Sequence, residues 1–557
     1  MLTDDLKKLI EGDVISDKAT LSKYDSDYSI FRVEPKVVVF PKDRKDVENL
    51  VSYAVEKRKN GEEISLTGRS AGTDMSGGPL NDSVIVEFTK YFNHIREIGD
   101  DYAIVEPGVY FRDLERELDK KNLLFPSCPA SKDLCAMGGI VNNNSGGEKT
   151  LEYGKTEKYV EEVTIVLADG KEHVLKPLSE NELQVKLREQ DFESDIYRKL
   201  YKLIKDNYDV IQAAKPKVSK NSAGYYLWNV CPPPACAGMA QAGDKKTFDI
   251  TKLIVGSQGT LGLLTSAKVK LLRKKRYSGL LVVFSKTLGP IPGLVEDILK
   301  FHPESIESYD DKTLKLAMRF LPSLLKLMKG SAIKLLFQFL PELRMVVQRG
   351  VPQMILLISF ASDNETKLKD DMNSAMGVVR NYPVGARVIK TEEGAQKYWT
   401  IRRQSFNLLH SHVKGMYAAP FIDDIVVDPK YMPELLPQVN AILDKYKDKL
   451  IYTIAGHPGN GNFHIIPLVR LNDEATRMII PKVTEEVYKL VFKYGGSITA
   501  EHNDGLIRTP YLEEMYGKKI ISLFEEVKDI FDPLRVFNPR KKVGGTFEYA
   551  MEHMRKE

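Results

Sequence analysis

Short apolar runs alternate with segments of helical periodicity through the first half of the chain. Residues 36–40 (KVVVF) are mostly β-branched and predict a strand, whereas residues 43–58 carry apolar side chains at helical spacing. A second helix is expected around residues 111–118. Further strand-like runs occupy residues 64–66, 83–88, 102–106 and 163–167. These elements predict an α/β region with mixed strands.

The pattern changes at about residue 276. Strand-like runs then alternate with helical segments as far as a strand at residues 450–454. The intervening elements are strands at 280–284 and 353–360 and helices at 292–301 and 364–379. Strands and helices that take turns twice predict a compact antiparallel sheet with helices on one face.

One part of this second half, residues 313–350, is rich in Leu, Met and Phe and unevenly charged. It holds seven Lys and Arg residues against Glu342 alone. Two amphipathic helices with basic polar faces fit an anionic membrane surface or the groove of a partner. The alternative is a pair of core helices whose lysine ammonium groups reach water.

Composition limits the possible classes. A chain of 557 residues is expected to form more than one domain, and a net charge of +4 gives no case for nucleic acid. Four cysteines without a CxxC pair make an iron–sulfur cluster or an all-cysteine zinc site unexpected, and Cys128 and Cys135 are expected as small buried residues. The chain starts with a charged helix and has no apolar run long enough to span a bilayer, so a cytoplasmic location is expected.

Three glycine-rich segments carry the first functional signal. They are residues 63–78 (EISLTGRSAGTDMSGG), 126–147 (PSCPASKDLCAMGGIVNNNSGG) and 254–264 (IVGSQGTLGLL). Glycine lets backbone N–H groups approach an anion closely, although the first segment alone is explained equally well by a surface turn. Three such segments in one half of a chain indicate one extended ligand that the backbone touches along its length.

In this order, the segments resemble those of the FAD-linked oxidases of the vanillyl-alcohol-oxidase type. Within that family, the chain is most similar to the FAD-dependent D-2-hydroxyacid dehydrogenases, which act on D-lactate, glycolate or D-2-hydroxyglutarate. The resemblance runs from about residue 35 to residue 543, where FDPLRVFNPRKKV is similar to the family ending FDPxxxxNPGK. It implies an α+β fold, with an FAD-binding domain of two α+β subdomains and an antiparallel-sheet cap domain with helices on one face.

The implied division gives residues 1–275 to the FAD-binding domain, 276–515 to the cap or substrate domain with the basic insertion 313–350, and 516–557 to a segment that returns to the FAD domain. The first loop lacks the histidine to which some relatives link the flavin, and Cys135 has a different spacing from a flavin-attaching cysteine. FAD is therefore expected to bind without a covalent link. The residues implied to hold it are Thr67, Gly68, Arg69, Ser70, Ala71, Gly72, Thr73, Ser76, Gly77, Pro129, Gly138, Gly139, Asn142, Asn143, Ser145, Gly146, Gly147, Gly256, Gly259, Thr260, Gly262 and Asn538.

A candidate metal site lies between residues 455 and 505. The run AGHPGNGNFH joins two strand-like stretches through a tight-turn signal, so a hairpin would bring His457 and His464 close together. Imidazole suits zinc, manganese or iron, but a structural histidine is commoner than a ligand. Glu501, in ITAEHNDG, would complete a set of two histidines and one glutamate with open positions for substrate.

The resemblance sharpens this prediction. The metal-dependent branch of the family carries GHxGxGNxH, which residues 456–464 match, and a later EH pair, which residues 501–502 match. It implies that His457, His464 and Glu501 are metal ligands, that His502 is the catalytic base and that Asn462 lies near metal and substrate. A histidine with its usual near-neutral pKa would accept the hydroxyl proton of the substrate.

The substrate is expected to be a hydroxyacid with one carboxylate. Arg402, in YWTIRRQ, matches the family's carboxylate-binding arginine, and the alternative for its neighbour Arg403 is a surface charge. Relatives that take dicarboxylic acids have a Thr and a Lys where this chain places Phe406 and Ile422. A second carboxylate therefore has no evident partner.

The predicted function is FAD-dependent, metal-assisted oxidation of a D-lactate-like D-2-hydroxyacid to the 2-oxoacid, with hydride transfer to flavin N5. Electrons would then pass to a quinone, a cytochrome, an electron-transfer flavoprotein or an iron–sulfur partner. The basic segment 313–350 would be the docking surface, so peripheral attachment to the inner face of the membrane is the alternative location.

Three other classes are open. The alkylglycerone-phosphate synthases share this fold and catalyse a non-redox transfer, but His410 and His412 are a thin match to their histidine-rich tract. The chain could also be a flavin subunit whose partner completes the site, against which the set of His457, His464, Glu501 and His502 argues. A metallohydrolase with purely structural glycine loops is the third.

Overall fold

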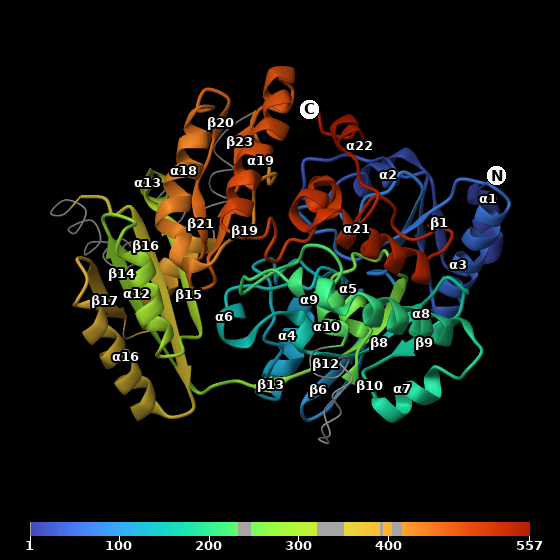
Figure 1. The fold of residues 1–557 in the computed structure, drawn as a ribbon, viewed down its shortest axis with the longest axis horizontal. Coiled ribbons are helices and arrows are strands. Elements are labelled where there is room, and N and C mark those ends of the chain that lie inside the picture. Colours follow the sequence, from blue (N-terminus) through green and yellow to red (C-terminus); the bar gives the residue numbers. More distant parts are fainter. Residues whose placement is uncertain are drawn as a thin grey trace.

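The computed structural model describes residues 2–231, 247–319, 350–389, 391, 394–403 and 415–556. Most of the basic segment, together with Cys236, Phe406, His410 and His412, lies outside these ranges. The described chain forms two lobes (Figure 1). We call them the N-terminal lobe, which holds a four-stranded and a five-stranded sheet, and the C-terminal lobe, which holds a seven-stranded sheet.

The four-stranded sheet has the order β1-β2-β4-β3. Its strands are β1 (Asp13–Ile15), β2 (Val37–Phe40), β4 (Val84–Glu87) and β3 (Leu66–Arg69). The last three run parallel, and every residue of β2 and β4 is buried. Helix α3 (Arg44–Lys59) shares one core cluster with this sheet, and α2 (Lys18–Tyr24) shares another. Burial on both faces explains why β2 reads as an unbroken apolar run.

The five-stranded sheet is antiparallel and has the order β5-β6-β12-β8-β9. Its strands are β5 (Ile95–Ile98), β6 (Tyr102–Val105), β12 (Leu263–Lys270), β8 (Val160–Val166) and β9 (Glu172–Leu175). Its core cluster includes residues of α4 (Phe111–Lys120), α5 (Met137–Asn142) and α8 (Phe192–Asp206). The late helix α21 (Leu512–Phe531) joins the same cluster through Leu523, Phe524 and Val527. The end of the chain therefore packs on the N-terminal lobe, as Figure 1 also shows.

The seven-stranded sheet is antiparallel and has the order β17-β14-β16-β15-β21-β22-β19. Its strands are β17 (Gly385–Ile389), β14 (Tyr277–Ser285), β16 (Met354–Ser362), β15 (Ser305–Asp310), β21 (Ile454–His457), β22 (Asn462–Ile465) and β19 (Ile425–Val426). The main helical layer consists of α12 (Ile291–Leu299), α16 (Glu365–Val379), α18 (Met432–Asp444) and α19 (Glu474–Lys493).

Side chains alternate between the two faces of this sheet. Leu281 and Leu356 enter the large cluster with the main helices, whereas Leu280 and Leu357 enter a smaller one. That smaller cluster includes Leu314 of α13 (Asp311–Arg319) and residues from the helical stretch 394–403. The α+β class is confirmed, and the predicted helical layer on one face is accompanied by this second cluster on the other.

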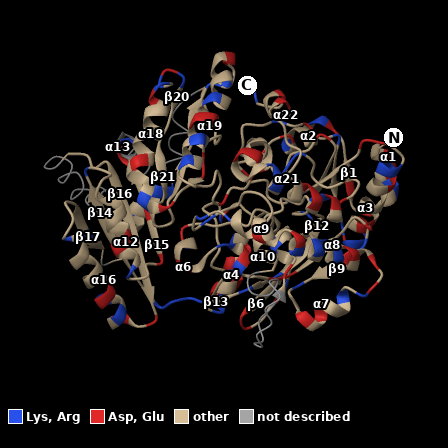
Figure 2. Ribbon diagram, viewed as in Figure 1, with Lys and Arg blue, Asp and Glu red and all other residues tan. Residues whose placement is uncertain are grey.

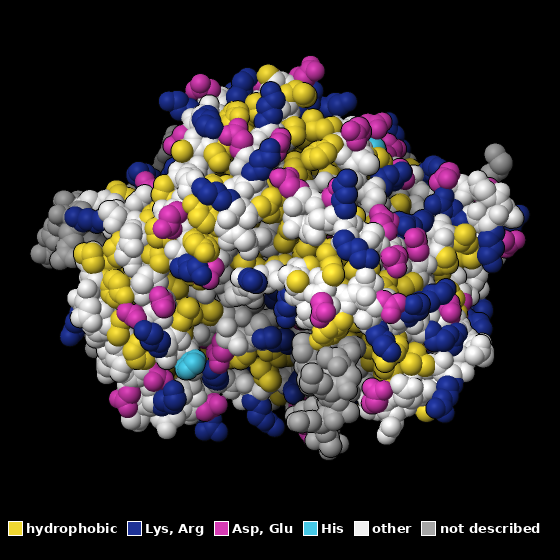
Figure 3. All heavy atoms as spheres, viewed as in Figure 1, with side chains coloured by type: hydrophobic (Ala, Val, Ile, Leu, Met, Phe, Trp, Pro, Cys, Tyr) yellow, Lys and Arg dark blue, Asp and Glu magenta, His cyan; other side chains and the backbone are white. Residues whose placement is uncertain are grey.

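Charges of both signs are interspersed over the ribbon of both lobes (Figure 2) and over the face drawn in Figure 3, in keeping with the small net charge. Within the described ranges, no helix is long and apolar enough to cross a membrane. Cys128 and Cys135 are free thiols, and Cys231 is disulfide-bonded.

Candidate active site

A cavity of about 950 Å³ lies between the two lobes. The glycine-rich segments line it from the N-terminal lobe, and a cluster of imidazoles and carboxylates lines it from the C-terminal lobe. Most of the residues predicted to hold a cofactor lie on its wall: Gly68, Arg69, Ser70, Ala71, Gly72, Thr73, Pro129, Gly138, Gly139, Asn142, Asn143, Ser145, Gly146, Gly147, Gly259 and Gly262.

The glycines of this wall allow the loops to pack against each other. A Cβ on Gly138 would lie 2.5 Å from Ser70 Oγ of the first loop, and a Cβ on Gly147 would lie 2.0 Å from the carbonyl oxygen of Cys128. Gly139, by contrast, borders the cavity, and a Cβ there would meet nothing within 4 Å. The wall is therefore built from backbone and small side chains, which suits an extended ligand such as a dinucleotide.

Six predicted cofactor residues do not line the cavity: Thr67, Ser76, Gly77, Gly256, Thr260 and Asn538. Thr67 Oγ1 donates to Asn538 Oδ1 at 2.9 Å, and the Asn538 amide donates to the carbonyls of Gly78 and Gln258. Thr67 and Asn538 thus link the first glycine-rich loop to the third. The Arg69 guanidinium donates to the carbonyls of Tyr24 and Ser26.

The predicted hairpin is present as β21 and β22. Gly461 turns the chain at a φ of 68°, and the register pairs His457 with Asn462 and Ala455 with His464. Since paired residues of an antiparallel ladder share a face, both histidines lie on the same side of the sheet, offset by two residues. Their Nε2 atoms are 3.0 Å apart.

Glu501 completes a group of three possible ligands. Its Oε1 lies 3.0 Å from His457 Nε2 and 4.0 Å from His464 Nε2. The turn that carries Glu501 is fixed by the buried carboxylate of Asp424, which accepts hydrogen bonds from the backbone N–H groups of Glu501 and His502 and from Thr499 Oγ1. One ligand atom from each of His457, His464 and Glu501 lies within 4.8 Å of the others.

The outer nitrogens of both histidines face carboxylates. His457 Nδ1 lies 2.5 Å from Glu307 Oε1, and His464 Nδ1 lies 3.2 Å from Asp423 Oδ1. A carboxylate at Nδ1 holds the proton there and leaves the Nε2 lone pair for a metal, the usual arrangement around ligating histidines. The residues therefore fit a divalent metal bound by two imidazoles and one carboxylate.

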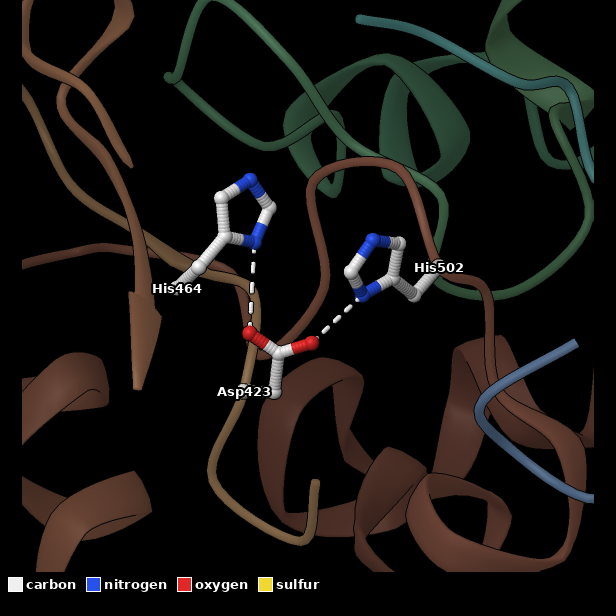
Figure 4. A group of neighbouring side chains, drawn as sticks. All are labelled: Asp423, His464 and His502. Carbon is white, nitrogen blue, oxygen red and sulfur yellow. Dashed lines mark hydrogen bonds and ion pairs between the residues drawn. The ribbon is translucent and has the colours of Figure 1, made fainter. Parts of the chain in front are cut away.

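His502 stands next to this group. Its Nδ1 lies 2.7 Å from Asp423 Oδ2, and its ring stacks on that of His464 with the centroids 5.1 Å apart (Figure 4). Burial favours the neutral imidazole, but the charges of Asp424 and Asp423 raise the pKa of His502 to about 9. In the metal-free protein the pKa of His502 therefore lies above the ordinary near-neutral value of a histidine.

The other charges of the cluster compensate one another. Burial opposes the ionisation of Glu501, but the ammonium of Lys220, 2.8 Å from its Oε1, and the imidazole of His457 hold the pKa of Glu501 well below its usual range. Burial likewise opposes ionisation of Asp423, and His502 and His464 hold its pKa low.

Two family models match the chain. The model described as "FAD binding domain" matches residues 35–176, and the model described as "FAD linked oxidases, C-terminal domain" matches residues 297–542. The chain belongs to the FAD-linked oxidases. The first match contains two of the cavity's glycine-rich segments, and the second contains all the imidazoles of its opposite wall.

Several curated relatives of this chain carry names of hydroxyacid enzymes. A D-2-hydroxyglutarate dehydrogenase from Escherichia coli strain K12 is 26% identical over 550 residues, which are 95% of this chain and 50% of the relative. The chain thus spans about half the length of the first such relatives. The glycolate oxidase subunit GlcD from Bacillus subtilis strain 168 is 26% identical, and the match covers 91% of this chain and 88% of the relative. A D-lactate dehydrogenase from Archaeoglobus fulgidus is 24% identical and covers 97% and 98%.

Solved structures agree with this chain in fold. The 4-ethylphenol oxidase from Gulosibacter chungangensis gives a TM-score of 0.67 at 16% identity and covers 98% of this chain and 97% of that one. An alkyldihydroxyacetonephosphate synthase gives a TM-score of 0.64 at 15% identity, and the match covers 97% of this chain and 84% of that one. At these identities the likeness establishes the architecture alone.

The remaining predicted site residues have distinct environments. Arg402 lines the cavity, and its guanidinium lies 3.2 Å from Glu307 Oε2. Arg403 is half-exposed and forms a bidentate pair with Glu148, so it is more than an isolated surface charge. Asn462 is fully buried behind the wall, where its amide donates to Asp424 Oδ1 and to the carbonyl of Ile425. Ile422 is part of the large apolar cluster.

Several functional neighbours were missed from the sequence. Glu307 and Asp423 orient the two histidines, Asp424 fixes the EH turn, and Lys220 pairs with Glu501. Asn503 ties this turn to the glycine-rich segments, because its amide donates to the carbonyls of Asn143 and Gly256. The available signal was the presence of carboxylates within apolar runs of the sequence: Glu307 in SIESYD, and Asp423 and Asp424 in FIDDIVV.

Proposed function

We propose that this protein is an FAD-dependent dehydrogenase that oxidises a D-lactate-like D-2-hydroxyacid to the 2-oxoacid with the help of a divalent metal. One observation carries the proposal. His457, His464 and Glu501 present their ligand atoms to a cavity that the glycine-rich segments also line, and His502 stands beside them. The names of relatives that match almost the whole chain, D-lactate dehydrogenase among them, support the same reaction.

The residues of the chain divide the work. FAD, held by the loops that line the cavity, would supply the hydride acceptor at N5. A divalent metal on His457, His464 and Glu501 would lower the pKa of the substrate hydroxyl. His502 would accept the hydroxyl proton at Nε2, because its Nδ1 faces Asp423. A pKa of about 9 keeps His502 protonated near neutral pH in the metal-free protein, and a nearby dication opposes that protonation.

The substrate side of the cavity favours an acid with one carboxylate. Arg402 offers a guanidinium to that carboxylate from the cavity wall. Among the described residues, the four lysines that line the cavity are engaged in ion pairs: Lys132 with Glu115, Lys149 with Glu304, Lys274 with Asp119 and Lys275 with Glu152. Ile422 is buried in the apolar core and offers nothing to a second carboxylate.

The electron acceptor is proposed to be a quinone or a protein: a cytochrome, an electron-transfer flavoprotein or an iron–sulfur partner. The word "subunit" in the name of the Bacillus relative supports a flavin subunit of a larger complex as the second candidate. Deleting residues 320–349 should abolish membrane or partner association and leave activity with an artificial dye unchanged. Association that survives the deletion would contradict docking through this segment.

The decisive experiment is an anaerobic absorbance spectrum of the purified protein before and after each enantiomer of a panel of hydroxyacids. We expect the flavin band to bleach with D-lactate or a close analogue and to stay unchanged with the L-enantiomer. Chelation should prevent the bleaching, and added metal should restore it. A yellow protein that no hydroxyacid bleaches would instead favour a non-redox transferase, and a colourless protein that cannot be reconstituted with FAD would contradict the whole proposal.

A further inference from the structure

Asp423 joins two histidines with different proposed roles. The residue directly precedes the tight turn at Asp424 and the strand β19, and its side chain is fully buried. Oδ1 lies 3.2 Å from His464 Nδ1 and Oδ2 lies 2.7 Å from His502 Nδ1. Figure 4 shows the carboxylate between the two rings, one oxygen turned to each.

We propose that Asp423 is a positioning residue that sets the tautomer and orientation of both imidazoles, one for metal binding and one for proton transfer. The proposal rests on the function proposed above for His464 and His502. Asp423 Oδ1 accepts a hydrogen bond from His464 Nδ1, which places the proton of that ring on Nδ1. Oδ2 forms a 2.7 Å ion pair with His502 Nδ1, and a negative charge at this distance likewise favours a proton on Nδ1. His464 Nε2 then lies toward His457 and Glu501, and Nε2 of His502, a residue that lines the cavity, is the atom left for proton transfer.

The surroundings hold the carboxylate in this place. The fully buried Arg508 donates from its guanidinium to the carbonyl of Asp423 at 2.8 Å and to the carbonyl of Asn503 at 2.9 Å. Asp424 grips the backbone of the turn that carries His502. Two neighbouring acids thus fix one histidine in two ways, Asp424 through its backbone and Asp423 through its ring.

A different use of these atoms would make Asp423, His464 and His502 a metal site of their own, since one ligand atom from each also lies within 4.8 Å of the others. The geometry favours positioning. The carboxylate faces the Nδ1 atoms of both rings, whereas His464 turns Nε2 toward the other group. The two possibilities differ in how many ions the protein binds and in what the loss of Asp423 does to them.

The test uses D423N and D423A in the FAD-loaded protein. An Asn amide can accept from one ring but donates to the other, and the ring that receives this bond must carry its proton on Nε2 and lose its lone pair there. Zn²⁺ affinity is measured by competition with a chelator, and flavin reduction by D-lactate is measured at saturating metal. In D423N, at least one of the two quantities should fall by about tenfold to a hundredfold. In D423A the Zn²⁺ affinity and the flavin reduction should both fall. The wild type and both variants should each bind one ion per chain.

D310N is the matched control. Asp310 is a buried carboxylate of the same lobe that accepts from the backbone N–H groups of Thr313 and Ile454, outside the group of His457, His464, Glu501 and His502. It should change thermal stability but not metal affinity.

Two ions in wild type and loss of one in D423N would overturn the proposal in favour of a ligand role, and unchanged values in both variants would overturn it altogether. A wild-type protein that binds metal but is reduced by no hydroxyacid would contradict the proposed function, while the affinity measurements would still test Asp423.

Discussion

The two walls of the cavity are built on opposite principles. The N-terminal lobe offers backbone and small side chains, and its glycines let loops approach to distances that a Cβ would prevent. The C-terminal lobe offers buried imidazoles and carboxylates, and some buried polar atoms there, such as Asn462 Oδ1 and Ser308 Oγ, make no hydrogen bond. Burying charges is costly unless they are paired, whereas a backbone wall carries no such cost. The wall of the N-terminal lobe therefore selects its ligand by shape, whereas the wall of the C-terminal lobe provides the groups for metal binding and proton transfer.

The largest effect that this contrast predicts is that of H502A. Removal of a general base commonly costs about 10²–10⁴ in rate, so flavin reduction by the hydroxyacid should fall by this factor. The FAD content should stay unchanged, because His502 belongs to the charged wall. Stopped-flow reduction and the flavin spectrum measure the two quantities, and H94A, at a largely exposed histidine of the N-terminal lobe, is the control. Loss of FAD from H502A would break the division between the walls.

The converse change is made in the backbone wall. In G147A the new Cβ would lie 2.0 Å from the carbonyl of Cys128, so the second loop must shift. Overpacking of this kind costs about 1–3 kcal/mol, which corresponds to a loss of FAD affinity of about 5–150-fold. Metal affinity should remain that of wild type. G377A, where a Cβ meets nothing within 4 Å, should leave both affinities unchanged.

A substitution at Lys220 tests the contact between the two walls. Lys220 belongs to the N-terminal lobe, and its ammonium pairs with Glu501 of the charged wall. The side chain is buried, and Nζ lies 2.8 Å from Glu501 Oε1. K220M removes the ammonium paired with the buried Glu501 carboxylate and leaves the carboxylate beside the imidazoles of His457 and His464, so the metal-free protein should lose about 3–5 kcal/mol of stability. A bound dication supplies the missing positive charge, so the loss should be much smaller with metal. Urea unfolding with and without Zn²⁺ checks this, and equal losses in both states would contradict it.

The sequence predicted the two walls to different degrees. The hairpin that carries His457 and His464 was predicted because its turn residues and its histidines are neighbours in the chain, and the structure confirms their proximity. Glu307 and Asp423 reach the same histidines from 150 and 41 positions away, and no local pattern encodes such a contact. In the glycine-rich segments the pattern predicted where the loops lie but not which of their side chains line the cavity. Thr67 and Asn538 were assigned to the ligand, whereas in the structure their side chains hydrogen-bond to each other.

The smallest predicted effect concerns a histidine of the N-terminal lobe that serves stability alone. His173 Nε2 lies 3.0 Å from Asp169 of the turn after β8, and Nδ1 lies 3.1 Å from Glu193 of α8. Burial lowers the pKa of His173, but hydrogen bonds with Asp169 and Glu193 outweigh it and raise the pKa to about 9.

Since this folded-state pKa lies above the unfolded value of about 6.5, the contribution of His173 to stability is fully present below pH 6.5 and is lost as the pH rises through about 9. H173Q should therefore lower the free energy of unfolding by about 1 kcal/mol at pH 6, after solvent screening, and by little at pH 10. Urea titrations at the two pH values measure the difference. Flavin reduction should be unchanged at both, because this imidazole faces a helix and a turn instead of the cavity. A loss of equal size at pH 6 and pH 10 would show that packing of the ring, and not its charge, holds the turn to the helix.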